Sequence, residues 1–115
     1  MAISEFEIRR CENELEKFLK VERPSAYLRD KLDIGYRIKD QSVELFEIRS
    51  ARNNLKELNE YPFAKSTFVK SKNHWKIYWQ RADLKWHSYE PYPVARTIEE
   101  FLCIVIEDEH ACFFG

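Results

Sequence analysis

The residue types best suited to chemistry are concentrated in one segment, from Trp75 to Tyr89. It contains all three tryptophans of the chain, interleaved with lysine and arginine. Aromatic rings stack on nucleobases and basic side chains neutralise phosphates, so this mixture is typical of single-stranded nucleic-acid binding. The same residue types also form hot spots of protein interfaces, or fill cores. The candidate binding residues are Lys76, Tyr78, Arg81, Asp83, Lys85, Trp86, His87 and Tyr89.

The charge of the chain is unevenly distributed. Between Lys65 and His87, six lysine and arginine residues accompany one acid, Asp83, which gives +5, so the rest of the chain carries −6 of a net −1. A basic segment favours phosphate binding, whereas an overall pI near 6.3 is low for a dedicated nucleic-acid-binding domain. Lysines also protect exposed strands against edge pairing. Nucleic-acid binding is therefore one of several functions that remain open.

A metal-dependent nuclease is the enzymatic alternative. Glu44 or Glu47, together with the Asp83-x-Lys85 pattern, resembles the acids and lysine with which such enzymes hold a divalent cation and position a water. Acid-x-Lys triplets arise often by chance in a chain that is 34% charged, and Asp83 has neighbouring basic residues with which to pair. We therefore expect a protein that is not an enzyme and that has no cofactor.

Near the C-terminus, Asp108, His110 and Cys112 alternate and could place three metal-ligand types on one side of an extended tail. Zinc requires four ligands, and the sequence supplies no fourth at a usable spacing, so no metal site is predicted. Cys11, Cys103 and Cys112 are odd in number and have no C-x-x-C spacing. This pattern indicates reduced thiols rather than a disulfide framework.

An acidic run and two adjacent phenylalanines raise a third hypothesis, a protein-interaction or self-associating module. Glu107, Asp108 and Glu109 lie where a helix should end, which is the unfavourable sign for the helix dipole. Basic residues of the same chain, or of a second protomer, would compensate for them. Phe113 and Phe114 likewise fill either the core of this chain or the groove of a partner.

Length and composition predict one folded domain over residues 1–115. The chain is 44% hydrophobic and carries a net charge of −1, which suits a packed core and an ordinary polar surface. No apolar run reaches the roughly 18 residues that span a bilayer, and no secretory signal opens the chain. We expect a cytoplasmic protein with no membrane partner.

The elements that position the candidate residues read as one helix, five strands and one helix. Ser4 and Thr97 are expected N-caps, with Glu7 and Glu100 three residues on, and Pro24 ends the first helix. The second helix is expected to end near residue 108. The predicted strands cover residues 32–38, 43–49, 66–70, 74–81 and 85–89.

Two segments are predicted to interrupt or end the sheet. Residues 50–62 are expected to form a loop, with one helical turn through Leu55 and Leu58, because asparagines and Pro62 break the pattern. Pro91 and Pro93 are expected to bar further pairing. The predicted fold class is α+β, an antiparallel sheet of about five strands with an N-terminal and a C-terminal helix.

Alternation along residues 75–80 separates the two faces of the tryptophan strand. Trp75, Ile77 and Trp79 share one face, which we interpret as core. The opposite face, which carries Lys76, Tyr78 and Gln80, is expected to be half-exposed. The side on which Trp86 lies is left open, because the turn at residues 82–84 interrupts the alternation.

Residues 75–91 read W-K-x-Y-W-x-R-A-D-L-K-W-H-x-Y-x-P, residues 43–49 read V-E-L-F-E-I-R, and the chain closes with C-F-F-G. From about Leu32 to the C-terminus, this resembles a family of small bacterial proteins, a domain of unknown function. The resemblance implies a compact α+β domain without known activity, substrate or cofactor. We predict a small non-catalytic binding module that uses the Arg81 to Tyr89 surface, its partner being nucleic acid, another protein or a second copy of the chain.

Overall fold

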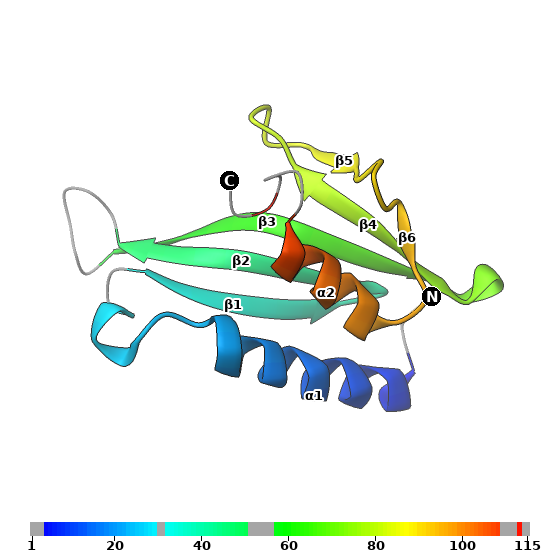
Figure 1. The fold of residues 1–115 in the computed structure, drawn as a ribbon, viewed down its shortest axis with the longest axis horizontal. Helices are drawn as coiled ribbons and strands as arrows, with labels where there is room; N and C mark the ends of the chain where they lie inside the picture. Colours follow the sequence, from blue (N-terminus) through cyan, green and yellow to red (C-terminus); the bar gives the residue numbers. More distant parts are fainter. Residues whose placement is uncertain (1–3, 30–31, 51–56, 109–112, 114–115) are drawn as a thin grey trace.

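The structure, a computed structural model, describes residues 4–29, 32–50, 57–108 and 113. Its strands form one antiparallel sheet in the order β1-β2-β3-β4-β5, and β6 also pairs with β4 (Figure 1). The predicted α+β fold with a helix on either side of the strands in the chain is confirmed. The elements are α1 (Glu5–Glu22), a 3-10 turn (Ala26–Leu28), β1 (Leu32–Lys39), β2 (Ser42–Ser50), β3 (Leu58–Val69), a second 3-10 turn (Lys70–Lys72), β4 (His74–Gln80), β5 (Trp86–Ser88), β6 (Val94–Ala95) and α2 (Ile98–Glu107).

Both helices begin at the predicted caps. The Ser4 hydroxyl accepts a hydrogen bond from the Glu7 N–H at 3.3 Å, and the Thr97 hydroxyl accepts one from the Glu100 N–H at 3.1 Å. Each hydroxyl satisfies one of the N–H groups that a helix leaves unpaired in its first turn. The helix α1 ends at Glu22, two residues before Pro24, as expected.

The strand β3 corrects the predicted loop over residues 50–62. It starts at Leu58, which lies in the strand and not in a helical turn, and it continues through Pro62; residues 51–56 lie outside the described part. Proline is accommodated because β3 pairs with β4 only from Ala64 onwards, so that Pro62 has a strand neighbour on one side alone.

A β-bulge sits beside this proline. Leu45 pairs with Ala64 and Phe46 pairs with Pro62, which leaves Phe63 as the extra residue. Phe63 and Ala64 both belong to the core although they are adjacent, a departure from strict alternation. The bulge thus delivers one more aromatic ring to the side of the sheet on which the helices pack.

The strand β6 corrects the prediction that Pro91 and Pro93 end the sheet. Val94 pairs with Lys76 and Ala95 with Trp75, while the carbonyl of Pro93 accepts a hydrogen bond from the Ile77 N–H at 3.0 Å. A proline lacks a backbone donor but keeps its acceptor. Both β5 and β6 consequently lie along β4, one after the other.

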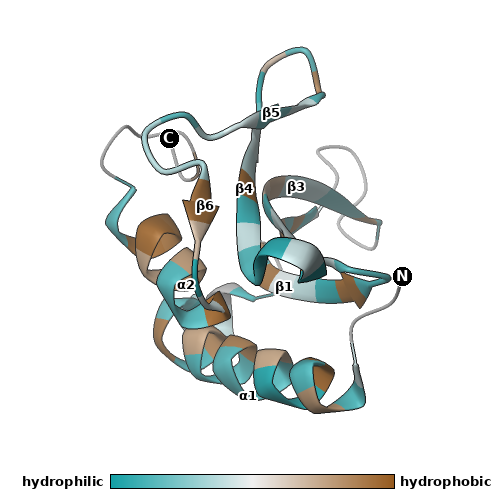
Figure 2. Ribbon diagram, turned by 90° about the vertical axis from the view of Figure 1, so that its right-hand side faces the viewer, coloured by the Kyte–Doolittle hydropathy of each residue, from teal (hydrophilic) through white to brown (hydrophobic). Residues whose placement is uncertain are grey.

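The core lies between the helices and one face of the sheet, and Figure 2 shows α1 and α2 on the same side of that sheet. Trp75 and Ile77 are 2% and 0% exposed, and Trp79 packs against this cluster, which confirms the predicted core face of β4. Phe113 is buried against the ring of Tyr89, at 4.8 Å between centroids. It therefore fills the core of its own chain; Phe114 lies outside the described residues.

Candidate functional site

The second face of the sheet, which we call the open face, has no described helix packed on it. Strand register places Lys65 opposite Tyr78, Thr67 opposite Lys76 and Gln80 opposite Trp86, and opposed residues of antiparallel strands point to the same side. That side is opposite to the core residues Trp75 and Ile77. We define the aromatic-basic patch as Lys65, Lys76, Tyr78, Gln80 and Trp86.

Lys65 is the central residue of the aromatic-basic patch. Its Nζ lies 6.0 Å from the ring centroid of Tyr78 and 5.7 Å from that of Trp86, within cation–π range of both. The side chains of all three are partly exposed. Within the described residues no carboxylate forms an ion pair with Lys65 or Lys76. Glu44, which the strand register places opposite Lys65, pairs instead with Arg37.

The β1 and β2 half of the open face is built differently. The Arg37 guanidinium covers the Phe46 ring at 4.4 Å and forms ion pairs with Glu44 and Glu60. The Phe46 ring in turn lies over Gly35, whose missing side chain makes room for it, and is only 7% exposed. On this half of the open face, the ring is covered and the charges are paired. The aromatic-basic patch is therefore the part of this face that offers rings and lysines to a ligand.

The hairpin between β4 and β5 carries three more candidate residues at its turn. Asp83 Oδ1 accepts the Lys85 N–H at 2.9 Å, and Asp83 Oδ2 lies 2.9 Å from His87 Nε2. The Lys85 N–H and then His87 hold the pKa of Asp83 below its usual value. Arg81 places its guanidinium over the Trp79 ring, 5.5 Å from the centroid. Asp83 is therefore committed to holding the turn.

Besides the hairpin turn, the predicted site residues occupy three places. Lys76, Tyr78 and Trp86 lie on the open face. The sequence left the side of Trp86 undecided; in the structure its side chain is partly exposed on this face. His87 lies opposite Trp79, on the helix side of the sheet. Tyr89 is 1% exposed and packs in the core, so it does not contribute to an accessible surface.

Lys65 is a site residue that sequence reasoning missed, whereas alternation placed Gln80 on the same face as Lys76 and Tyr78. The sequence does contain the information that pairs Lys65 with Tyr78. A three-residue connection after Lys70 fixes which residues of β3 lie opposite which residues of β4. Continued alternation back from Thr67 would have placed Lys65 beside Tyr78. The predicted start of this strand at residue 66 cut that inference off by one position.

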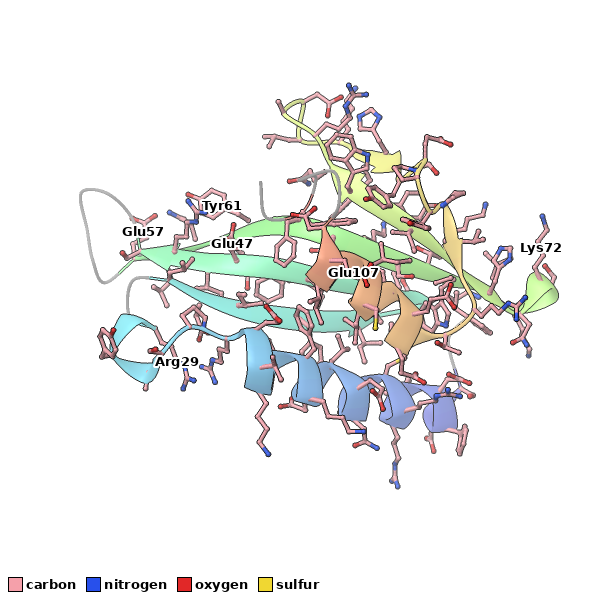
Figure 3. All side chains as sticks on the ribbon, viewed as in Figure 1. Arg29, Glu47, Glu57, Tyr61, Lys72 and Glu107 are labelled. Atoms are coloured by element: carbon pink, nitrogen blue, oxygen red, sulfur yellow. The ribbon has the colours of Figure 1, made fainter. Side chains whose placement is uncertain are left out.

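The residues considered for metal binding are not assembled into a cluster. In the described ranges, no three His, Cys, Asp or Glu side chains are grouped so as to hold a metal ion. Glu44 is on the open face with Arg37, whereas Glu47 points to the helix side, where it lies beside its register partner Tyr61 (Figure 3). His110 and Cys112 lie outside the described residues. None of the described helices is long and apolar enough to cross a membrane.

Residues 3–115 match the family described as a domain of unknown function, DUF3024. The chain belongs to the DUF3024 family. The match extends the predicted resemblance towards the N-terminus, so α1 is part of the family domain. No curated protein and no solved structure matches the chain. The description of DUF3024 states no activity, and the function of this member is therefore argued from the site itself.

Proposed function

We propose that this DUF3024 domain is a non-catalytic binding module that holds single-stranded nucleic acid on its open face. One observation carries the proposal: the Lys65 ammonium lies between the partly exposed rings of Tyr78 and Trp86, with no ion-pair partner in the described part of the chain. Together the three side chains offer two surfaces for base stacking and a cation for the phosphate that links the bases. The bacterial, cytoplasmic setting that the sequence predicts is part of this proposal.

The chemistry of the patch favours unpaired bases over a duplex. A ring stacks only on a base whose face is accessible, and each stacked base contributes about 1 to 3 kcal/mol to binding. Lysines at the two sides of such a platform neutralise phosphates without reading the sequence. The patch is accordingly expected to bind single strands with little sequence preference.

The low pI of the chain is compatible with this site because the acidic excess lies outside residues 65–87, a segment that carries +5 against −6 for the rest of the chain. Arg10 binds Glu99 between the two helices at 3.0 Å, and Arg23 binds Asp33 at 2.7 Å. Neither pair belongs to the aromatic-basic patch. The acidic excess therefore lies mainly on other parts of the surface, while the segment around β4 keeps its basic character.

Removal of one stacking ring tests the proposal. Trp86→Ala should weaken the binding of a fluorescein-labelled oligothymidylate by about 5- to 150-fold, the loss of one stacked base, as measured by fluorescence anisotropy at low salt. Tyr27→Ala is the matched control, because Tyr27 is 80% exposed on a 3-10 turn remote from the patch. Equal losses in both variants, or no binding by the unmodified protein, would refute the proposal.

Acrylamide quenching of tryptophan fluorescence separates this function from self-association. Trp75 is buried, so the quenchable signal should come mainly from Trp86 and the partly exposed Trp79. Oligonucleotide should reduce that quenching in the unmodified protein but not in Trp86→Ala. Protection that grows with protein concentration alone would instead favour an interface between two copies of the chain.

A further inference from the structure

A cavity of about 620 Å³, which we call the basic cavity, lies where β4 and α2 begin. Its walls come from the 3-10 turn before β4, from β4 and β6, and from the first turn of α2. The lining includes two permanent cations, Lys72 and Arg96, and the imidazole of His74, against one carboxylate, that of Glu100. The cavity therefore combines a concave shape with an excess of positive charge.

The pairing of β6 with β4 brings two of these basic side chains together. Val94 of β6 lies opposite Lys76 of β4. In the same antiparallel register, two residues further along the chain from Val94 and two residues back from Lys76, Arg96 comes opposite His74. Both side chains line the basic cavity. Alternation along β4 sets His74 on the same side of the sheet as Lys76, so the cavity adjoins the open face.

The turn before β4 brings the third basic side chain to the same place. Asn73 has a φ of 52°, in the left-handed region that asparagine tolerates, and its N–H donates to the Lys70 carbonyl at 3.2 Å. This turn carries Lys72, which Figure 3 labels at the end of the molecule. A closed local turn thus sets Lys72 at the wall of the basic cavity.

The fold itself leaves the polar groups of the basic cavity unused. In residues 57–108, neither Lys72 nor Arg96 has a side-chain ion pair or hydrogen bond. His74 Nε2 is buried and has no hydrogen-bond partner among the described residues, which costs free energy. The Thr97 hydroxyl accepts the Glu100 N–H at 3.1 Å and still has its own proton to donate. Several donors are therefore available to an anion.

We propose that the basic cavity binds a phosphate group. A guanidinium can donate to two phosphate oxygens at once, and an ammonium adds a point charge. Arg96 and Lys72 supply these two groups, and the Glu100 carboxylate reduces their positive charge without cancelling it. The inference goes beyond the proposed function and does not depend on it. The phosphate belongs either to a small free compound or to a strand on the adjoining open face.

Inorganic phosphate is the probe that tests the basic cavity, and NMR of the His74 imidazole is the readout. At constant pH and ionic strength, replacing chloride by phosphate should shift the His74 signals saturably; their absence in His74→Gln assigns them. Arg96→Gln should weaken phosphate binding by about tenfold, because one charge-assisted hydrogen bond is lost. Arg9→Gln is the matched control, since Arg9 is exposed on α1 outside the cavity, and it should bind phosphate normally.

The outcomes separate the phosphate site from the proposed function. Saturable binding that is weakened in Arg96→Gln but not in Arg9→Gln, at equal melting temperatures, supports the inference; Lys72→Gln is a second variant with the same expectation. No shift of the His74 signals by phosphate, or equal binding in Arg96→Gln and Arg9→Gln, overturns it, whether or not the protein binds oligothymidylate.

A titration of the same His74 signals with oligothymidylate identifies the source of the phosphate. Signals that move with the strand, and move less in Arg96→Gln, assign the site to a phosphate of the bound strand. Signals that respond to inorganic phosphate alone assign it to a small free compound. In that case the nucleic-acid proposal depends on the Trp86→Ala experiment by itself.

Discussion

Gly35 is the residue of the open face at which a side chain is least tolerated. A Cβ there would lie 2.9 Å from Phe46 Cε2 and 3.0 Å from Cζ, and the ring is held from above by the Arg37 guanidinium. Gly35→Ala should therefore lower the free energy of unfolding by about 1 to 3 kcal/mol, as overpacking does elsewhere. Urea unfolding followed by tryptophan fluorescence measures it.

Lys39→Ala in the same strand is the control for Gly35→Ala. Lys39 is exposed at the end of β1, so its replacement should change the free energy of unfolding by less than about 0.5 kcal/mol. If Gly35→Ala unfolds at the same urea concentration as the unmodified protein, the Phe46 ring moves aside without cost, and its close contact with Gly35 contributes nothing to stability.

The face on which a single residue lies could be predicted from the sequence only where alternation within one strand determines it. Trp75 and Ile77 were assigned to the core because two-residue periodicity needs no knowledge of neighbouring strands. The role of Lys65 depends on register with Tyr78, which is a property of two strands. The position of Trp86 required the conformation of the turn before it, including the left-handed Leu84, which no rule for leucine predicts.

At the scale of elements, an ion pair ties the end of α1 to the start of β1. Arg23 Nε and Nη2 each donate to one carboxylate oxygen of Asp33, both at 2.7 Å. This pair holds the pKa of Asp33 below its usual value, chiefly through the hydrogen bonds from Arg23. The bidentate geometry fixes the angle at which the helix leaves the sheet.

Stability should depend on pH through this pair. A carboxyl whose pKa is lower in the folded than in the unfolded state contributes fully above its usual pKa of 3.8, and the contribution is lost as pH falls through the folded value. Arg23→Gln should lower the melting temperature at pH 7, where Asp33 is charged, and this loss should shrink as the pH falls below 3.8.

Thermal melts across pH, with an NMR titration of Asp33, test this expectation. The pKa of Asp33 should rise in Arg23→Gln. Lys17→Gln serves as the control, since Lys17 is largely exposed and its pair with Glu14 lies within one helix. A loss of stability in Arg23→Gln that stays constant from pH 7 to pH 2 would show that Arg23 acts by packing and not through the charge of Asp33.

The elements that the sequence mispredicted are the ones whose pairing depends on their neighbours. Pro62 and Pro93 were interpreted as the limits of strands, which is correct for a proline flanked by strands on both sides. In the fold, Pro62 borders only β2, and Pro93 contributes its carbonyl alone. The helices, in contrast, are specified by caps and apolar spacing within themselves, and both were predicted correctly.

At the scale of the whole molecule, no described helix packs on the open face, and the nucleic acid proposed to bind there would make affinity depend on salt. With about two phosphates neutralised by Lys65 and Lys76, affinity for a single strand should fall about 7-fold between 50 and 200 mM salt. Lys65→Met, which removes the charge but keeps an unbranched side chain of similar length, should reduce the slope of log affinity against log salt by about 0.7.

Lys20→Met is the control for this salt series, because Lys20 is exposed in the last turn of α1, outside the aromatic-basic patch. It should leave the slope unchanged. Isothermal titration or anisotropy at four salt concentrations gives the slopes. Affinity that does not change with salt would contradict phosphate neutralisation and indicate an uncharged ligand for the open face.

The two helices that cover the core come from opposite ends of the chain, and Arg10 of α1 meets Glu99 of α2. During synthesis, the meander of β1 to β5 emerges before α2, so the side of β4 with Trp75 and Ile77 stays incompletely covered until residues 98–107 leave the ribosome. A nascent chain stalled before that point would be prone to aggregate and would be a client of chaperones. The cover of this core face therefore forms only after α2 has been synthesised.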